Sequence, residues 1–423
     1  MTIKNKNSKF SFLLGSGFSI PDKLPSVNEL NKKLQAIDQN EIFIGSDQLA
    51  FFLNGQINPN DYERKDERLF LQEFLKFYNE KILKSGESFN YEKFYDFYSS
   101  YLNSKNNSET IESFYNIFTD KYINAKFNNR DCFNRISDFD RTFNQLIASL
   151  LQKDIYQGNA TYLNYTKYGS FINFLKYLIE IADVKVHTLN HDLLFDFLGG
   201  YQSELCSYYS DGYEFEGSPF YGTISKRISE ELNEEINKTY YVKLRRFTNK
   251  FNSRLSLFKL HGSIDNIIVY LPDSNTPISH IKRDFGISSY YFESFDKQIN
   301  EFKFLQLYNE ISPNFISGTT NKIRSYEKDP YYNNLLEHFK NNLINSEYLF
   351  IIGYGFADPG INKHIKDYFL CHKNRKIILI DPCVLDNDLI RNINHIHIRK
   401  GIQDVSFSEL ISSMSSNRTN PAH

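Results

Sequence analysis

A chain of 423 residues exceeds the usual domain size of about 100–200 residues, so we expect one large domain or two merged ones. Its 41% hydrophobic and 24% charged residues are typical of a globular protein and argue against a disordered one. The net charge of −2 provides no global attraction to nucleic acid or to an anionic membrane, so we expect no direct nucleic-acid contact.

The sequence shows no signal for export, membrane insertion or zinc binding. Phe10–Leu14, an apolar segment near the N-terminus, is too short for a signal-peptide core, and no run elsewhere has the length that spans a bilayer. No two of the four cysteines form a Cys-x-x-Cys pair, which excludes a familiar zinc ribbon and argues against a disulfide framework. These features predict a reduced, cytoplasmic protein with no membrane contact.

The first predicted element is a short strand, Phe10–Leu14, which runs directly into the turn Gly15-Ser16-Gly17-Phe18-Ser19. Ser26 with Glu29 three residues later is a capping-box signal for a helix that extends through Leu34. The order strand, glycine turn, helix is typical of the start of an α/β nucleotide-binding site. The glycine pair alone is equally explained by a tight turn that needs positive φ.

Between residues 41 and 182 the apolar pattern becomes helical. Large apolar residues recur at spacings of three and four, which predicts several antiparallel helices inserted into the α/β fold. The periodic stretches are 69–82, 114–122, 133–150 and 171–179. The chain contains 38 Phe and 30 Tyr, which we interpret mainly as core filler. The aromatic-rich helices are nevertheless the candidate surface for assembly.

Strand patterns return after residue 182. The predicted strands are Val184–Thr188, Leu255–Leu260, Tyr348–Ile352, Lys376–Ile380 and His395–Ile398. Near-continuous apolar runs of this kind are typical of a parallel sheet that is buried on both faces. In the polar segment before the second of these strands we expect a helix around Ile224–Tyr241.

These patterns predict an α/β fold with a Rossmann-like parallel sheet and a large helical insertion. The sheet domain comprises residues 1–40 and 183–405, the insertion residues 41–182, and a C-terminal tail residues 406–423. Ligands of such sheets bind beyond the carboxyl ends of the strands. We therefore expect one site built from the loops after Leu14, Thr188, Leu260 and Ile352.

The loop after Thr188 places short polar side chains, Asn190 and Asp192, in an apolar setting. Buried amides and carboxylates must be paired or functional, because leaving one unsatisfied costs about 1–3 kcal/mol. Asp192 is also suited to cap a helix that begins near Leu193, and this role is compatible with ligand contact.

Three further strand ends are followed by candidate residues. His261 directly follows its strand and is suited to act as a general base near neutral pH, although a lone histidine is more often a packed or surface residue. The turn Gly353-Tyr354-Gly355 permits a ligand to approach the backbone closely. Asp381 is placed to accept hydrogen bonds from an adenosine ribose or, alternatively, to cap a turn.

In order and spacing these motifs resemble those of the sirtuin-like family, especially a zinc-less bacterial branch of NAD⁺ hydrolases that act in antiphage defence. The resemblance covers about residues 10–30 and 183–400. The matching segments are Gly15-Ser16-Gly17-Phe18-Ser19, Thr188-Leu189-Asn190-His191-Asp192 with Gly199, Leu260-His261-Gly262-Ser263, Ser317-Gly318-Thr319 and Gly353-Tyr354-Gly355-Phe356-Ala357-Asp358.

The resemblance implies that the chain takes NAD⁺ as a substrate and hydrolyses the nicotinamide–ribose bond, with Asn190, Asp192 and His261 as catalytic residues. The residues that it implies for dinucleotide binding are Gly15, Ser16, Gly17, Ser19, Thr188, Gly353, Tyr354, Gly355 and Asp381. Deacylating sirtuins carry two zinc-binding Cys-x-x-Cys pairs after the histidine box, and this sequence has none. The arginine of the family's Asp-Phe-Arg loop also has no clear counterpart. Both departures favour NAD⁺ cleavage without zinc over deacylation.

The resemblance further implies an NAD-depleting effector of abortive infection that is controlled by homo-oligomerisation or by a partner protein, such as a HerA-like ATPase. Two alternatives stay open. One is an NAD-dependent protein deacylase. The other is a non-catalytic subunit whose pocket senses a nucleotide within a defence complex.

Overall fold

The computed structural model describes residues 9–45, 49–53, 64–104, 106–122, 131–152, 165–200, 204–229, 235–270, 277–283, 287, 289–307, 313–315, 329–372, 375–383, 387–391 and 395–415. The expected turn Ser317-Gly318-Thr319 and the last part of the predicted tail, residues 416–423, lie outside the described residues. No helix within the described ranges is long and apolar enough to cross a membrane.

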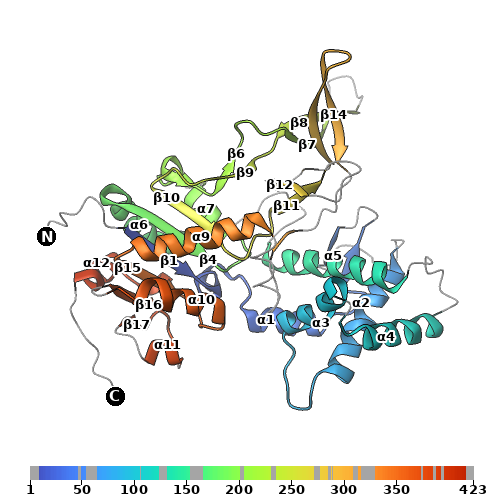
Figure 1. Ribbon diagram of the computed structural model, residues 1–423, viewed down its shortest axis with the longest axis horizontal. Coiled ribbons are helices and arrows are strands. Elements are labelled where there is room, and N and C mark those ends of the chain that lie inside the picture. The colour runs from blue at the N-terminus through green and yellow to red at the C-terminus, as the bar shows by residue number, and fades with distance from the viewer. Residues whose placement is uncertain are drawn as a thin grey trace.

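A seven-stranded sheet in which every neighbouring pair is parallel lies at the centre of the fold (Figure 1). Its strands, in sheet order, are β17 (His395–Ile398), β16 (Lys376–Ile380), β15 (Tyr348–Ile352), β1 (Lys9–Leu14), β4 (Asp183–Thr188), β10 (Leu255–Lys259) and β5 (Tyr209–Ser210). The predicted α/β class and the six predicted strands are confirmed, whereas the two-residue β5 was not predicted.

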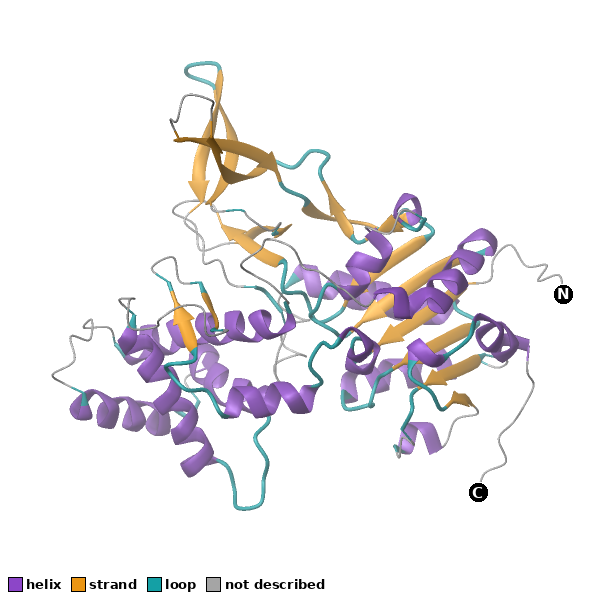
Figure 2. Ribbon diagram, turned by 180° about the vertical axis from the view of Figure 1, so that it is seen from behind, coloured by secondary structure: helices purple, strands orange, loops and turns teal. Residues whose placement is uncertain are grey.

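Successive residues of the central strands pack on opposite sides of the sheet, because strand side chains alternate between its faces. Phe12 and Phe350 belong to one buried apolar cluster, and Leu13 and Ile351 belong to another. Helices α6 (Gly169–Ile181) and α12 (Phe407–Ser415) contribute to the first cluster. Helices α9 (Pro330–Asn345) and α10 (Pro359–His364) contribute to the second, so both faces are covered (Figure 2).

The helical part lies beside the sheet and has its own aromatic interior (Figure 1). It comprises α1 (Val27–Gln35), the hairpin β2 (Ile42–Ile44) and β3 (Ala50–Phe52), α2 (Lys65–Phe77) with a π-helical turn at Tyr78–Ile82, α3 (Tyr91–Ser104), α4 (Ser108–Lys121) and α5 (Cys132–Leu151). The predicted capping box is present, since Ser26 and Glu29 exchange both hydrogen bonds at the start of α1. Helix α3 and the β2–β3 hairpin were not predicted.

Most aromatic rings of these helices fill the interior of the helical part. Phe70, Phe74, Phe94, Phe139 and Phe143 are at most 3% exposed and contact one another in edge-to-face or offset arrangements. The interpretation of the aromatic residues as core filler therefore holds for this region. Helix α6, which lies within the predicted insertion, instead packs on the sheet through Phe171, whose ring lies 5.9 Å from that of Phe12.

Two small antiparallel sheets are formed by the segment between β5 and α9. One has the order β11 (Asn266–Tyr270), β12 (Pro277–Lys282), β9 (Arg246–Lys250) and β6 (Gly212–Glu214). The other has the order β14 (Glu301–Leu307), β13 (Ser289–Asp296), β7 (Phe220–Ser229) and β8 (Glu235–Lys243), and it projects from the body of the protein (Figure 1).

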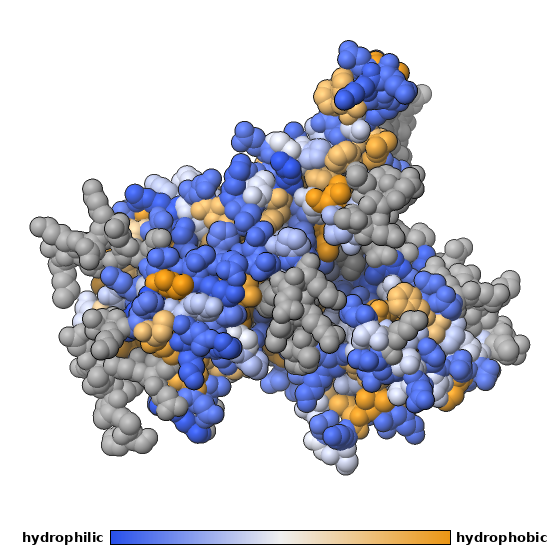
Figure 3. Space-filling model, in the orientation of Figure 1, coloured by the Kyte–Doolittle hydropathy of each residue, from blue (hydrophilic) through white to orange (hydrophobic). Residues whose placement is uncertain are grey.

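The helix predicted around Ile224–Tyr241 is wrong, because β7 and β8 pair there as an antiparallel hairpin. Alternate residues such as Phe220, Ile224 and Val242 pack in the apolar cluster beneath this sheet, so the real period is two. Large apolar residues are also exposed on the hairpins, with Phe302 65% exposed. On the face seen in Figure 3, hydrophobic residues are scattered among hydrophilic ones.

Candidate functional site

The four expected loops meet at one edge of the sheet, because β15, β1, β4 and β10 are adjacent and end at the same level. Leu14 lies opposite both Ile352 and Thr188, and Thr188 lies opposite Lys259. A cavity of about 320 Å³ lies beyond these strand ends, a size suited to a small-molecule ligand.

Eight of the twelve predicted site residues line this cavity. They are Gly15, Ser16, Ser19, Asn190, Asp192, His261, Tyr354 and Gly355. The opposite wall comes from the helical part, chiefly Val27 and Leu30 of α1, Tyr91 and Glu92 of α3, and Leu151 of α5. The helical insertion therefore helps to form the site, which the sequence did not predict.

The glycines in the loops after Leu14 and Ile352 allow these two loops to pack closely on each other. Gly15 and Gly17 donate their N–H groups to the carbonyls of Ile352 and Gly353. A Cβ atom on Gly15 would lie 2.5 Å from the Gly353 carbonyl oxygen, and Gly353 itself has φ +61°. Gly355 differs, because a Cβ atom there would meet nothing within 4 Å, and the residue lines the cavity.

The four remaining predicted residues, Gly17, Thr188, Gly353 and Asp381, are not among those that line the cavity. The Thr188 hydroxyl accepts a hydrogen bond from the Asn190 N–H at 3.0 Å, which shapes the turn. The Asp381 carboxylate accepts the Cys383 N–H at 2.8 Å, as expected of a turn cap.

Asn190 is fixed by the loop after β1. Its Nδ2 atom donates to the Gly15 carbonyl at 2.9 Å and to the Ser19 hydroxyl at 3.0 Å. Because the amide has two N–H donors and both have acceptors, its carbonyl oxygen Oδ1 is the group suited to bind a water or a hydroxyl in the cavity.

Asp192 lines the cavity and also makes the capping contact expected from the sequence. Its Oδ1 atom accepts the Leu194 N–H at 2.9 Å, at the start of α7 (Leu194–Gly200), and its Oδ2 atom accepts the Ser19 hydroxyl at 2.8 Å. Burial raises the pKa of the Asp192 carboxyl above its ordinary value, although the charge of Lys259 and these hydrogen bonds oppose the shift.

His261 lies just beyond β10, with its Nε2 atom 3.3 Å from Oδ2 of Asp358. Both side chains are well buried, at 5% and 13% exposed. The other carboxylate oxygen of Asp358 accepts the Ile361 N–H at 3.0 Å and caps α10. Since the cap fixes the carboxylate, Asp358 places a rigidly held carboxylate oxygen beside the imidazole of His261.

Three lining residues that carry a carboxylate or an imidazole, Asp358, His191 and Glu92, were absent from the predicted set. Asp358 is the last residue of the motif in the loop after Ile352. Its place directly before Pro359 is a helix-start signal, and this signal predicts a carboxylate that is held in place as a helix cap. His191 lies between Asn190 and Asp192, and its ring centroid is 6.3 Å from that of His261. Glu92 has no comparable signal, because it belongs to the helical part outside the recognised motifs.

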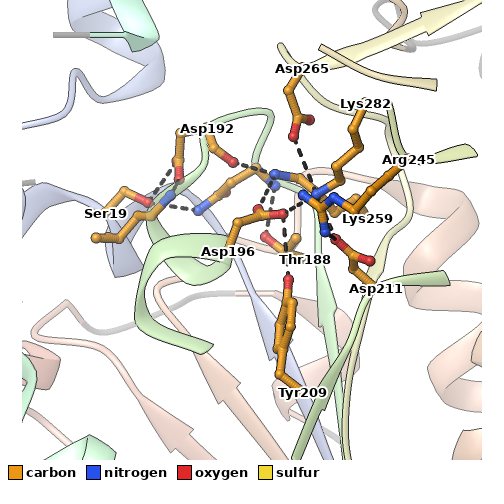
Figure 4. Close-up of polar contacts among 12 residues, drawn as sticks. Ser19, Thr188, Asp192, Asp196, Tyr209, Asp211, Arg245, Lys259, Asp265 and Lys282 are labelled. Carbon is orange, nitrogen blue, oxygen red and sulfur yellow. Dashed lines mark hydrogen bonds and ion pairs between the residues drawn. The ribbon is translucent and has the colours of Figure 1, made fainter. Parts of the chain in front are cut away.

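A buried network of charges lies behind the Asp192 turn (Figure 4). Asp196 of α7 accepts hydrogen bonds from Lys259 at 2.7 Å and from Lys282 at 2.6 Å. Lys282 also lies 2.8 Å from Asp211 and 3.2 Å from Asp265, and Arg245 lies 3.2 Å from Asp211. The three carboxylates are thus matched by three cations.

The opposite charges in this network shift the pKa values of Asp196 and Lys282 against the effect of burial. Burial alone would raise the pKa of Asp196, but Lys259 and Lys282 hold it well below its usual range. Burial alone would lower the pKa of Lys282, but the three carboxylates raise it well above its usual value. Asp196 and Lys282 therefore remain charged at neutral pH.

No group of three or more His, Cys, Asp or Glu residues within the described part of the chain is arranged to hold a metal ion.

The chain matches no protein-family model, and no curated protein sequence matches it. Solved structures overlay loosely on it. A Sir2 homologue–NAD complex is 9% identical, with a TM-score of 0.36 over 96% of this chain and 90% of the other. A Sir2 homologue mutant with 2′-O-acetyl ADP ribose is 11% identical, with a TM-score of 0.34 over 97% and 95%. A structure on sirtuin substrate affinity is 10% identical, with a TM-score of 0.34 over 99% and 100%. Overlays this loose carry no information about chemistry.

Proposed function

We propose that this protein is an NAD⁺ glycohydrolase that releases nicotinamide and ADP-ribose. The observation that carries the proposal is the convergence of Asn190, Asp192 and His261 on one cavity at the carboxyl edge of a parallel sheet. The order of the surrounding motifs along the chain, which resembles that of the sirtuin-like NAD⁺ hydrolases, supports the same substrate.

In the proposed reaction, the bond between ribose C1′ and the nicotinamide nitrogen breaks, and its electron pair neutralises the cationic ring. The Oδ1 atom of Asn190 accepts a hydrogen bond from a water and orients it toward C1′. The water oxygen forms the new bond to C1′ as positive charge develops there. His261 takes the water proton and later passes it to solvent.

Asp192 and Ser19 hold the nicotinamide end in this proposal, since the carboxyl and hydroxyl groups hydrogen-bond to each other and both residues line the cavity. The leaving group departs as a neutral molecule, so it needs no protonation by the protein. Apolar side chains of the helical wall, including Val27, Leu30 and Leu151, would limit the access of other water.

The same resemblance leads us to propose a biological role as an NAD-depleting effector of bacterial antiphage defence. Such an activity must be controlled, and we propose control by self-association or by a partner protein such as a HerA-like ATPase. Cytoplasmic NAD⁺ is the pool on which it would act.

The proposed catalysis is tested with Asn190→Ala and His261→Ala, with His395→Ala as a matched control on β17, whose residues are not among those that line the cavity. We expect both site variants to lose NAD⁺ cleavage by about 100-fold or more while remaining folded at the assay temperature, and the control to stay active. Nicotinamide release is followed by chromatography. Full turnover in both site variants would show that the chemistry lies elsewhere.

A further inference from the structure

Lys259 is a buried lysine at the end of the strand that leads to His261. It lies two residues before His261, at the end of β10, and only 6% of its side chain is exposed. Its ammonium group donates to the backbone carbonyl of Asp192 and to Oδ2 of Asp196 (Figure 4). Both acceptors belong to the loop and helix that follow β4.

Stability alone gives a weak reason for a lysine in this place. Removing an ammonium group from water is costly, and replacing a buried ion pair with apolar side chains of similar volume is often neutral or stabilising. The position of the two acceptors supplies a stronger reason. Through its contacts with them, Lys259 joins the loop that carries Asp192 to the end of β10, which leads to His261.

The loop after β4 is fastened to the segment around His261 at three points. Leu260 N–H donates to the Thr188 carbonyl at 3.0 Å, and Ile264 N–H donates to the His191 carbonyl at 3.0 Å. The contact from Lys259 to the Asp192 carbonyl is the third, and it is made by a side chain. These contacts lie on both sides of His261 in the sequence, so together they fix the loop relative to it.

Lys259 is itself held in place by the charge network. Asp196 is shared with Lys282, which also binds Asp211 and Asp265 on the antiparallel side of the molecule. Because Asp196 cannot turn away without breaking its contact with Lys282, the ammonium group of Lys259 stays directed at the loop.

We propose that Lys259 is a positioning residue that holds the Asp192 loop against the end of β10 and so fixes Asn190 and Asp192 relative to His261. The structural part of this inference stands on the contacts alone. Its catalytic consequence rests on the proposed NAD⁺ cleavage.

The structural part is tested by hydrogen–deuterium exchange on the full chain. We expect Lys259→Met to speed exchange in peptides that cover residues 189–195 by about 10-fold or more, while peptides from α2 and α5 keep their wild-type rates. Lys185→Met is the matched control, because Lys185 is a buried lysine on neighbouring β4 that binds Ser256 and the Ser253 carbonyl instead. Wild-type exchange at 189–195 in Lys259→Met, or an equal rise in the control, would overturn the proposal.

Two further variants separate position from overall stability. Asp196→Asn removes charge but leaves the contact from Lys259 to the Asp192 carbonyl, so we expect a smaller rise in exchange at 189–195 than in Lys259→Met. A rise as large as that of Lys259→Met would assign the effect to the charge network. If Lys259→Met does not fold, Lys259→Gln takes its place. Faster exchange at 189–195 then supports the proposal, and wild-type exchange there overturns it.

The catalytic part uses the same proteins. If the wild type cleaves NAD⁺, Lys259→Met should lower kcat by about 10-fold with a smaller change in KM, and Lys259→Arg should restore part of the loss. An unchanged kcat would overturn this part. If the wild type does not cleave NAD⁺, the proposed function fails, while the exchange result still decides whether Lys259 positions the loop.

Discussion

Asp358 performs two structural tasks, since one carboxylate oxygen caps α10 and the other faces His261. Asp358→Asn retains the cap, because asparagine is as good an N-cap residue as aspartate. It removes the negative charge that would stabilise His261 after it accepts a proton. We expect normal folding but a fall in kcat of about 10-fold or more, measured across pH 6–9. Wild-type kcat throughout that range would exclude the proposed partnership.

Gly353 and Gly355 provide a matched pair of glycines two residues apart. Gly353→Ala should destabilise the protein by more than about 2 kcal/mol, because its φ is +61° and a Cβ atom would lie 2.4 Å from the backbone of Gly17. Gly355→Ala should leave stability unchanged and raise KM, since its methyl group enters space beside the cavity. Urea unfolding and steady-state kinetics check both; equal stability of the two variants would contradict the account.

His187 makes folding sensitive to acid. It is fully buried on β4, its Nδ1 atom lies 3.0 Å from the Phe12 carbonyl, and Asn342 donates to its Nε2 atom. Burial lowers the pKa of His187 to about 3 from its ordinary value of 6.5. Its stabilising effect is therefore complete above pH 6.5 and is lost as the pH falls, by about 1.4 kcal/mol per pH unit.

This pH dependence is measured as the difference between wild type and His187→Gln, because partly buried histidines with lowered pKa values, such as His338 and His397, act in the same direction. Between pH 6.5 and 5.5 the wild type should lose about 1 kcal/mol more unfolding free energy than the variant. Parallel stability curves for the two proteins would contradict the assignment to His187.

At the scale of elements, the sheet was predictable because its strands are continuous apolar runs that end in polar loops. Tyr348–Ile352, Lys376–Ile380 and His395–Ile398 have the predicted bounds. Their order in the sheet depends on pairing between distant segments, so it was not predicted. The loops that meet were predicted, because ligands of parallel sheets bind beyond the carboxyl ends of the strands.

The β7–β8 hairpin and helix α3 show where local pattern is insufficient. Residues 238–241 of β8 are exposed, and β7 pairs with β13, which lies far along the chain, so tertiary contacts decide the structure of the hairpin. In α3 the helical spacing of Tyr91, Phe94, Tyr98 and Tyr101 is present in the sequence. This spacing was sufficient to predict α3 from the sequence, although the helix was not predicted.

At the scale of the whole molecule, the cavity belongs to both the sheet and the helical part. The motifs identified the sheet side, where Asn190, Asp192 and His261 lie. Burying a polar side chain without a partner costs free energy, so polar residues that follow buried strands indicate paired or functional groups. The helical wall with Tyr91 and Glu92 was not predictable, since its place depends on how α1, α3 and α5 pack beside the sheet. A ligand in this cavity would therefore contact both parts of the chain.

The most direct test of the central claim is the product balance of the wild-type protein incubated with NAD⁺, alone and with an acylated peptide. The account predicts that nicotinamide and ADP-ribose appear in equal amounts without the peptide. Nicotinamide release that requires the acylated peptide would identify a deacylase. Tight NAD⁺ binding without any nicotinamide would identify a nucleotide-sensing subunit, and either result would contradict the proposed hydrolase.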